Sequence, residues 1–130
     1  MKLRTYEEMA KIGRDYYSDS NFCSIIAIAI ACNKSYGKVY NDMKKLGRRD
    51  NRGANIIQIK ACVRKYKKEM ITLTERQGAT FSGCSKTAHK HAGAVRMHLS
   101  KGHIAAQING KLEDWSHKSL IRITHTFEVR

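Results

Sequence analysis

The fold of this chain is decided near its N-terminus by the stretch Cys23-Ser24-Ile25-Ile26-Ala27-Ile28-Ala29-Ile30-Ala31-Cys32. An apolar run of this length forms either a strand or a buried helix, and periodicity alone does not separate the two. Three alanines and the polar turn over 18–21 favour the helix, although isoleucine is also common in strands. We therefore expect a buried central helix that begins at Cys23.

Further helices are indicated around this run. Thr5 and Glu8 have the spacing of a capping box, which predicts a short first helix. Ser35 can cap another helix, and Gly47 suits the position just after its end. Steps of three and four predict an amphipathic helix with the apolar positions Ile56, Ile59, Val63, Tyr66 and Met70. A short strand over 71–74 is expected to follow.

The second half of the chain is expected to begin with a loop of small residues over 78–83. Helical spacing then predicts a helix that ends near Lys101-Gly102, with apolar positions at Ala88, Ala92, Val95 and Leu99. A last strand is expected over 120–129. Helices come first and antiparallel strands last, which predicts an α+β fold. Without proline or a low-complexity linker, the 130 residues are expected to form one domain, 1–130.

Asn109-Gly110 is typical of a two-residue β-turn and predicts a hairpin between 103–108 and 111–116. Side chains alternate between the faces of a sheet. One face would therefore carry His103, Ala105, Gln107, Leu112, Asp114 and Ser116. The other face would carry Ile104, Ala106, Ile108, Glu113 and Trp115. His103 and Asp114 become diagonal neighbours, close enough for a carboxylate to orient an imidazole.

A histidine and a carboxylate in contact make up two parts of a nucleophilic triad, and Cys23 is the candidate for the third. At the start of the predicted helix, free N–H groups favour a thiolate and can also bind an oxyanion. Cys32 and Cys62 are expected to be inert core thiols, and Cys84 lies in a loop. Each residue alone is more often structural, so the argument rests on the three together.

Two groups of short motifs follow each other along the chain, the first around Cys23 and the second around His103 and Asp114. The first is Asn21-Phe22-Cys23-Ser24-Ile25-Ile26-Ala27-Ile28-Ala29 with Ser35-Tyr36-Gly37-Lys38-Val39-Tyr40. The second is Gly102-His103-Ile104-Ala105 with Gly110-Lys111-Leu112-Glu113-Asp114-Trp115. Together they span roughly 18–116 and resemble the papain-like cysteine peptidase superfamily, in particular its small bacterial and phage members related to C39-like peptidases.

The resemblance implies a papain-like fold, with a central buried helix packed on a C-terminal antiparallel sheet. It implies a thiol hydrolase acting on a peptide, isopeptide or amide bond. Cys23 would be the nucleophile, His103 the general base and Asp114 its orienting group. The family often has an oxyanion-stabilising glutamine where this chain has Tyr17, so Asn21 or the backbone N–H of Cys23 would take that role. Phe22 likewise replaces an acidic residue common in the small relatives.

The net charge of +14 supports a different function, a catalytically inactive papain-like scaffold that binds nucleic acid or protein through a basic surface. Residues 34–70 carry twelve basic and three acidic residues, a net +9. The candidate polyanion-binding residues are Arg48, Arg49, Arg52, Lys60, Arg64, Lys67 and Lys68, with Tyr40 and Tyr66 as stacking partners. The same surface could recruit an acidic host protein as substrate, or simply be a solvated face.

The sequence also leads to expectations about metal binding, membrane insertion and cellular location. A metal site among Cys84, His89, His91, His98 and His103 is a weaker alternative, because no zinc-ligand spacing is present, and we expect neither metal nor cofactor. No apolar run is long enough to span a bilayer, and the first residues are not typical of a signal peptide. We expect a cytoplasmic protein, acting in the host cytoplasm if it is encoded by a phage.

Overall fold

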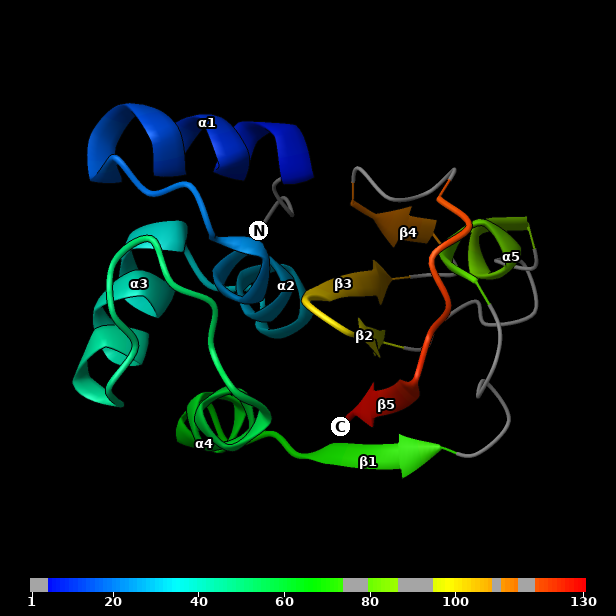
Figure 1. Cartoon of the computed structure of the whole chain (residues 1–130). Helices are drawn as coiled ribbons and strands as arrows, with labels where there is room; N and C mark the ends of the chain where they lie inside the picture. The colour runs from blue at the N-terminus through cyan, green and yellow to red at the C-terminus, as the bar shows by residue number, and fades with distance from the viewer. Residues whose placement is uncertain (1–4, 74–79, 87–94, 109–110, 115–118) are drawn as a thin grey trace.

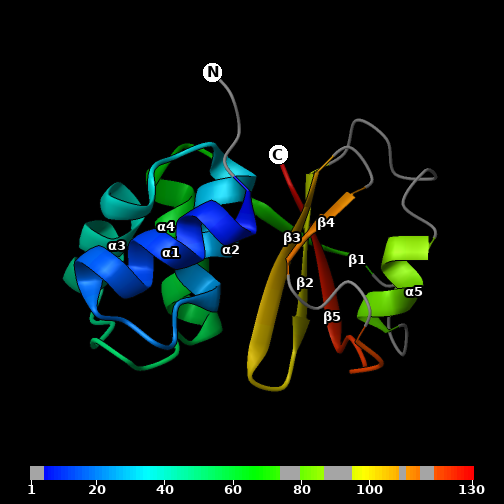
Figure 2. The same cartoon turned by 90° about the horizontal axis from the view of Figure 1, so that it is seen from above.

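The structure is a computed structural model, and it describes residues 5–73, 80–86, 95–108, 111–114 and 119–130. Its helices are α1 (Tyr6–Tyr17), α2 (Cys23–Cys32), α3 (Tyr36–Lys45), α4 (Ile56–Lys65) and α5 (Phe81–Lys86). Its strands are β1 (Met70–Leu73), β2 (Val95–Ser100), β3 (His103–Ile108), β4 (Lys111–Glu113) and β5 (His125–Val129). Helices α1 to α4 lie on one side of the sheet and α5 on the other (Figures 1 and 2). The α+β expectation is confirmed.

The described strands form one antiparallel sheet in the order β1-β5-β2-β3-β4. Strand β5 lies between β1 and β2, where Phe127 pairs with Thr72 on one side and with Met97 on the other. Strands β2 and β3 are joined by a tight turn, and Gly102 in this turn has a φ of 84°. A positive φ of this size is easily adopted only by glycine among common residues.

Helix α2 is the centre of the molecule, as predicted. Ile25, Ile28 and Ala29 are fully buried, and the helix packs against β3 while α1, α3 and α4 surround it. A helix that is apolar on all sides must be covered on all sides. The helix ends where Asn33 adopts a left-handed conformation with a φ of 54°.

Side-chain caps begin α1 and α3 at the residues that the sequence indicated, and a third cap, which was not predicted, begins α4. The Thr5 hydroxyl accepts a hydrogen bond from the Glu8 N–H, and Ser35 accepts one from Lys38. Asn55 caps α4 through a reciprocal capping box with Gln58. Such caps satisfy N–H groups that have no partner within the helix.

The opposite face of the sheet has a small core of its own, formed by Phe81, Ala105, Leu112 and Ile123. Strand β3 is therefore buried on both faces, with Ile104 and Ala106 toward the helices and Ala105 toward α5. This is the alternation that the hairpin geometry predicted. The pairing of Ile108 with Lys111 and of Gln107 with Leu112 also follows the predicted register. The turn itself, Trp115 and Ser116 lie outside the described residues.

The amphipathic helix is shorter than its pattern predicted. It ends at Lys65, because Lys67 adopts a left-handed φ of 62° that no α-helix accommodates. Met70 instead begins β1, opposite Val129. The apolar spacing continued past the end of the helix because Tyr66 and Met70 still pack against the main core from non-helical positions.

The predicted helix ending near Lys101-Gly102 is wrong for residues 95–100, which form β2. Val95 and Leu99 are four residues apart, a spacing that shares a face in a strand as well as in a helix. Met97 lies between them on the same face and is fully buried, which fits only the strand alternation. Ala88 and Ala92 lie outside the described residues.

Two smaller predictions also change. The predicted loop over 78–83 contains the start of α5 at Phe81, and the last strand begins at His125 rather than at Leu120. The chain before it is irregular, with Arg122 forming a single bridge to Thr80. None of the described helices combines the length and the apolar composition needed to cross a membrane.

Candidate active site

Cys23 is the first residue of α2 and is half-buried as a free thiol. Phe22 occupies the N-cap position without a side-chain cap. The N–H groups in the first turn of a helix lack helical acceptors and carry its partial positive charge. Cys23 is thus placed where both a thiolate and an adjacent oxyanion are stabilised.

His103 and Asp114 are in direct contact, as the hairpin geometry predicted. The Nε2 atom of His103 lies 2.7 Å from an Oδ2 of Asp114, and their side chains are only 9% and 3% exposed. His103 is the first residue of β3, and Asp114 follows directly after β4. Glu113 points to the other face, where its carboxylate accepts a hydrogen bond from the Tyr6 N–H at 3.1 Å.

The imidazole of His103 is coupled to Cys23 as well as to Asp114. Burial alone would lower the pKa of His103, but hydrogen bonds with Asp114 and then with Cys23 outweigh it and raise the pKa to about 9. Since Nε2 faces Asp114, Nδ1 is the nitrogen left for the Cys23 sulfur. At neutral pH the imidazole is therefore mainly protonated, and an imidazolium is the partner that a thiolate requires.

Two aromatic residues enclose this group. The ring of Phe81 meets that of His103 edge-on, with centroids 5.4 Å apart, and so limits how the imidazole can turn. Tyr6 lies on the helical side, and its pKa is raised to about 12 by burial and then by the charges of Asp114 and Cys23. Its phenol thus stays neutral at physiological pH. No local signal in the sequence pointed to Tyr6, because its position depends on contact with the far end of the chain.

The loop before Cys23 is held by a buried ion pair that the sequence did not reveal. Arg48 Nη2 lies 2.8 Å from Asp19 Oδ2, and both side chains are almost completely buried. Arg48 also donates to the carbonyl of Asn21 at 2.7 Å, while Asp19 accepts from the Asn21 N–H at 3.0 Å. Asn21 is exposed, and both of these hydrogen bonds are made by its backbone. Its role as oxyanion donor stays a prediction.

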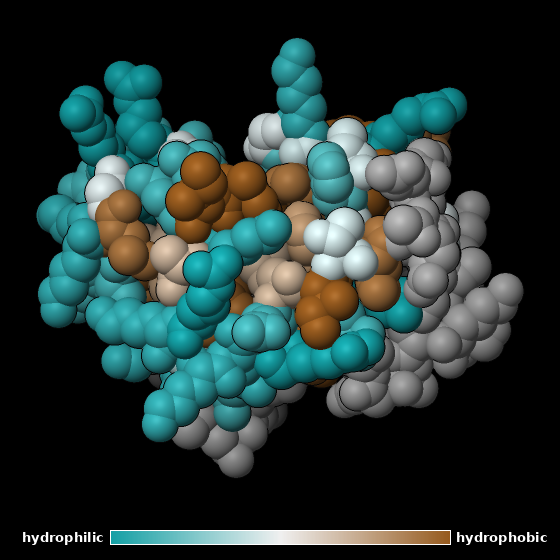
Figure 3. Space-filling view, turned by 90° about the horizontal axis from the view of Figure 1, so that it is seen from below, coloured by the Kyte–Doolittle hydropathy of each residue, from teal (hydrophilic) through white to brown (hydrophobic). Residues whose placement is uncertain are grey.

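The same ion pair corrects one predicted polyanion-binding residue. Arg48 is 4% exposed and is committed to Asp19, so it is not part of the outer basic surface. Tyr40 is also buried and donates to Asp50, which removes it as a stacking partner. The other candidates stay at least partly exposed, and these are Arg49, Arg52, Lys60, Arg64, Lys67 and Lys68. Seen from below relative to Figure 1, the surface carries long hydrophilic side chains with hydrophobic patches between them (Figure 3).

Among the remaining cysteines and histidines that the structure describes, Cys32, Cys62 and His98 are buried and His125 is exposed. Cys32 and Cys62 are buried, and burial raises the pKa of both thiols, that of Cys32 to about 11. His98 is buried and bonds to Thr126 and Gln107, at 3.0 and 2.8 Å. His89 and His91 lie outside the described residues, as does the side chain of Cys84. Among the residues that the structure describes, no three potential ligands are grouped around a metal position.

Comparison with known proteins adds no relative. No protein-family model matches the chain, and no curated protein or solved structure matches it. The geometry of Cys23, His103 and Asp114 is therefore the basis on which a function can be proposed.

Proposed function

We propose that this protein is a papain-like thiol hydrolase with Cys23 as nucleophile, His103 as general acid and base, and Asp114 as orienting group. The observation that carries the proposal is the position of His103, hydrogen-bonded to Asp114 at 2.7 Å and also to Cys23 at the first turn of α2. The sheet supplies the imidazole and carboxylate, and the central helix supplies the thiol. This is the division of roles between helix and sheet that the papain-like resemblance implies.

In the proposed reaction, the imidazolium of His103 pairs with the thiolate of Cys23, and this thiolate attacks the carbonyl carbon of a peptide, isopeptide or side-chain amide. N–H groups at the start of α2 stabilise the oxyanion. The imidazolium then protonates the leaving nitrogen, and the C–N bond breaks to give a thioester. Water, deprotonated by His103, hydrolyses the thioester and restores the thiol.

The first test is the rate at which iodoacetamide alkylates Cys23, followed by mass spectrometry of the Cys23 peptide between pH 6 and 10. The native protein is expected to react at pH 6 at least about tenfold faster than the His103→Ala variant, since the proposed mechanism relies on the His103 imidazolium to stabilise the attacking sulfur. His125→Ala removes an exposed imidazole from another part of the sheet and is the matched control. Equal rates for the native protein, His103→Ala and a free thiol would overturn the active triad.

Turnover is tested separately from thiol activation. A mixture of synthetic peptides and glutamine-containing peptides is incubated with the protein, and cleavage or deamidation is read by mass spectrometry. Cys23→Ser is the blank. Products that form with the native protein and not with Cys23→Ser support a hydrolase or deamidase. An activated thiol without product from any peptide would limit the substrate to a structured protein, such as an acidic host protein recruited by the basic surface.

A second candidate function is an inactive papain-like scaffold that binds nucleic acid or protein. The observation that favours it is the exposed basic group of Arg49, Arg52 and Arg64 on the helical side. An unreactive Cys23 together with steeply salt-dependent binding to an oligonucleotide would support this function over the hydrolase.

We also propose that the protein acts in the cytoplasm, of a host cell if it is phage-encoded. Cys23, Cys32 and Cys62 are all free thiols in the structure, and a cysteine nucleophile is best preserved in a reducing compartment.

A further inference from the structure

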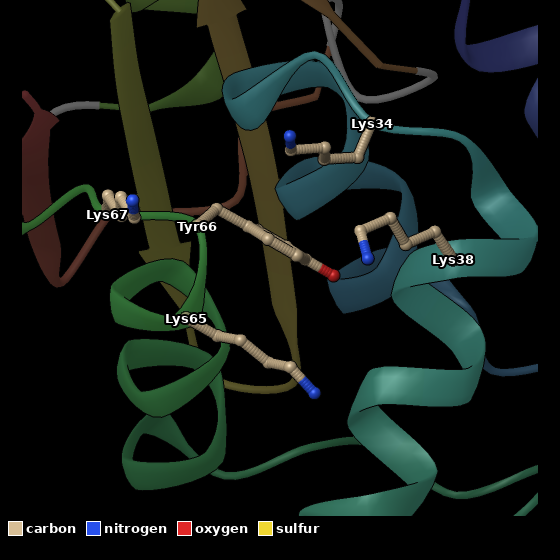
Figure 4. A pocket seen from close by; sticks show the side chains of 5 residues that line it. All are labelled: Lys34, Lys38, Lys65, Tyr66 and Lys67. Atoms are coloured by element: carbon tan, nitrogen blue, oxygen red, sulfur yellow. The ribbon is translucent and has the colours of Figure 1, made fainter.

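A polar hollow lies at the C-terminal end of the central helix, the end opposite to Cys23. It has a volume of about 230 Å³ and is lined by Lys34, Lys38, Lys65, Tyr66 and Lys67 (Figure 4). Lys34 follows the end of α2, Lys38 lies in the first turn of α3, and the other three residues lie at or just after the end of α4. Three helix ends thus bring four lysines to one place, although the lysines are dispersed in the sequence.

The tyrosine ring holds two of the ammonium groups over the hollow. The Nζ of Lys34 lies 5.4 Å from the centre of the Tyr66 ring, and that of Lys38 lies 5.7 Å from it. Figure 4 shows both side chains turned toward the phenol. Two like charges attracted to the same ring repel each other, and an anion placed between them would relieve this repulsion.

One carboxylate below the hollow anchors the group without neutralising it. Asp42 accepts hydrogen bonds from the Tyr66 hydroxyl at 2.6 Å and from Lys65 at 3.0 Å, and it lies 3.6 Å from the Nζ of Lys38. Its side chain is 7% exposed and is not among the residues that line the hollow. The four lysines that line the hollow and Asp42 together carry a formal charge of +3.

We propose that this hollow, the Tyr66 pocket, is a binding site for a multiply charged phosphate-type oxyanion. The ammonium groups supply donors and positive charge, and Tyr66 and Asp42 hold them in place before the anion arrives. The volume lies below the ~300–1,000 Å³ typical of sites for larger ligands, which favours a phosphate or pyrophosphate group over a whole nucleotide. The phosphate could be a free ion or part of a nucleic-acid backbone that passes over the pocket.

A second hollow beside α4 allows the positive charge of the Tyr66 pocket to be compared with that of another basic site. It has a volume of about 200 Å³ and is lined by Lys60, Arg64, Glu69 and Met70. There, two cations face a carboxylate and an apolar side chain, so the excess positive charge is smaller. We expect an anion to prefer the Tyr66 pocket over this hollow. The site at Cys23 lies at the opposite end of α2, and the inference does not rest on the proposed hydrolase.

The test is a titration of the full chain with pyrophosphate, observed by isothermal calorimetry and by NMR shifts of the Tyr66 ring. We expect saturable binding of one pyrophosphate that weakens as salt is raised. Lys34→Gln/Lys38→Gln is expected to weaken this binding by about tenfold or more, since two charges close to the anion are removed. Lys11→Gln/Arg14→Gln removes two exposed charges from α1, away from the pocket, and is expected to change pyrophosphate binding by less than about twofold.

The outcomes separate the sources of the phosphate. If a short single-stranded oligonucleotide also binds and is weakened by Lys34→Gln/Lys38→Gln, a nucleic-acid backbone is the source. If pyrophosphate alone binds, the ligand is a free anion or a small phosphate ester. The proposal is overturned if pyrophosphate does not saturate the native protein, or if both double variants weaken binding equally. Circular dichroism of each variant confirms that it is folded.

Discussion

The residue that links the parts of the candidate site is His103. Its imidazole is buried between a carboxylate and a thiol, and its charge is stabilised by both. A raised histidine pKa means that the folded protein binds this proton more tightly than the unfolded chain does. The contribution to stability is fully present below the ordinary histidine pKa of ~6.5 and is lost as the pH rises through about 9.

We predict from this that Asp114→Asn lowers the pKa of His103 and destabilises the protein more at pH 6 than at pH 9.5. The difference between the two pH values is expected to be at most about 3 kcal/mol, from the size of the shift. The pKa is measured by NMR titration of the imidazole, and stability by urea unfolding. An unchanged pKa in the variant would contradict the hydrogen-bonded pair.

A second residue-scale prediction concerns the buried pair of Asp19 and Arg48. Asp19→Asn leaves the guanidinium of Arg48 buried without its charge partner, which typically costs about 3–5 kcal/mol. Alkylation of Cys23 is also expected to slow, because the pair holds the backbone just before it. Urea unfolding and the iodoacetamide assay measure the two effects.

Lys44→Gln is the control for the buried pair, because it breaks an exposed contact with Asp50. Its cost is expected to stay below about 1 kcal/mol. A loss of the same size from both variants would show that burial adds nothing to the Asp19 pair.

At the scale of elements, the predictions succeeded where a short range of sequence determines the structure. Thr5 and Ser35 begin helices because the partner of each cap lies three residues away. The register of β3 and β4 was predictable from Asn109-Gly110 because a two-residue turn leaves one pairing. The contact of His103 with Asp114 followed from that register alone.

Prediction failed where the structure of a segment, or the environment of a side chain, depends on residues far away in the sequence. Val95 and Leu99 suit a helix or a strand, and the choice depends on pairing with β3 and β5, which the spacing does not show. Arg48 looked like part of a basic loop because its partner, Asp19, precedes the central helix. Tyr6 could not be placed at the site, since its neighbour Glu113 is more than a hundred residues away.

The turn between β2 and β3 yields an element-scale prediction. Gly102 has a φ of 84°, and open space surrounds the position that a Cβ atom would take. Gly102→Ala is therefore expected to cost about 1–2 kcal/mol through backbone strain without any clash. Gly53→Ala, at a position without a positive φ, is the control for glycine replacement. Urea unfolding measures both, and equal costs would contradict the strain.

For the whole molecule, the excess of positive charge determines the response to acid. Burial would raise the pKa of Asp42, but hydrogen bonds from Tyr66 and Lys65 and the charge of Lys38 lower it below its ordinary value. A lowered carboxyl pKa contributes stability that is present above the unfolded pKa of about 3.9 and is lost as the pH falls through the folded pKa. Protonating carboxylates also increases a net charge that is already +14.

We predict that the melting temperature falls steeply below about pH 4, and that 0.2 M salt recovers part of the loss by screening repulsion between like charges. Thermal unfolding between pH 6 and pH 2.5, at low and moderate salt, measures both effects. A melting temperature that is independent of salt at pH 3 would show that self-repulsion plays no part.

The candidate site combines a residue from early in the chain with two residues from late in the chain, and this order matters during protein synthesis. The ribosome makes Cys23 early and His103 and Asp114 late, and β5, which is inserted between β1 and β2, comes later still. A nascent chain therefore carries the thiol long before the imidazole that would activate it. If the proposed activity is correct, the thiol is not activated until the chain has been made through Asp114 and β5.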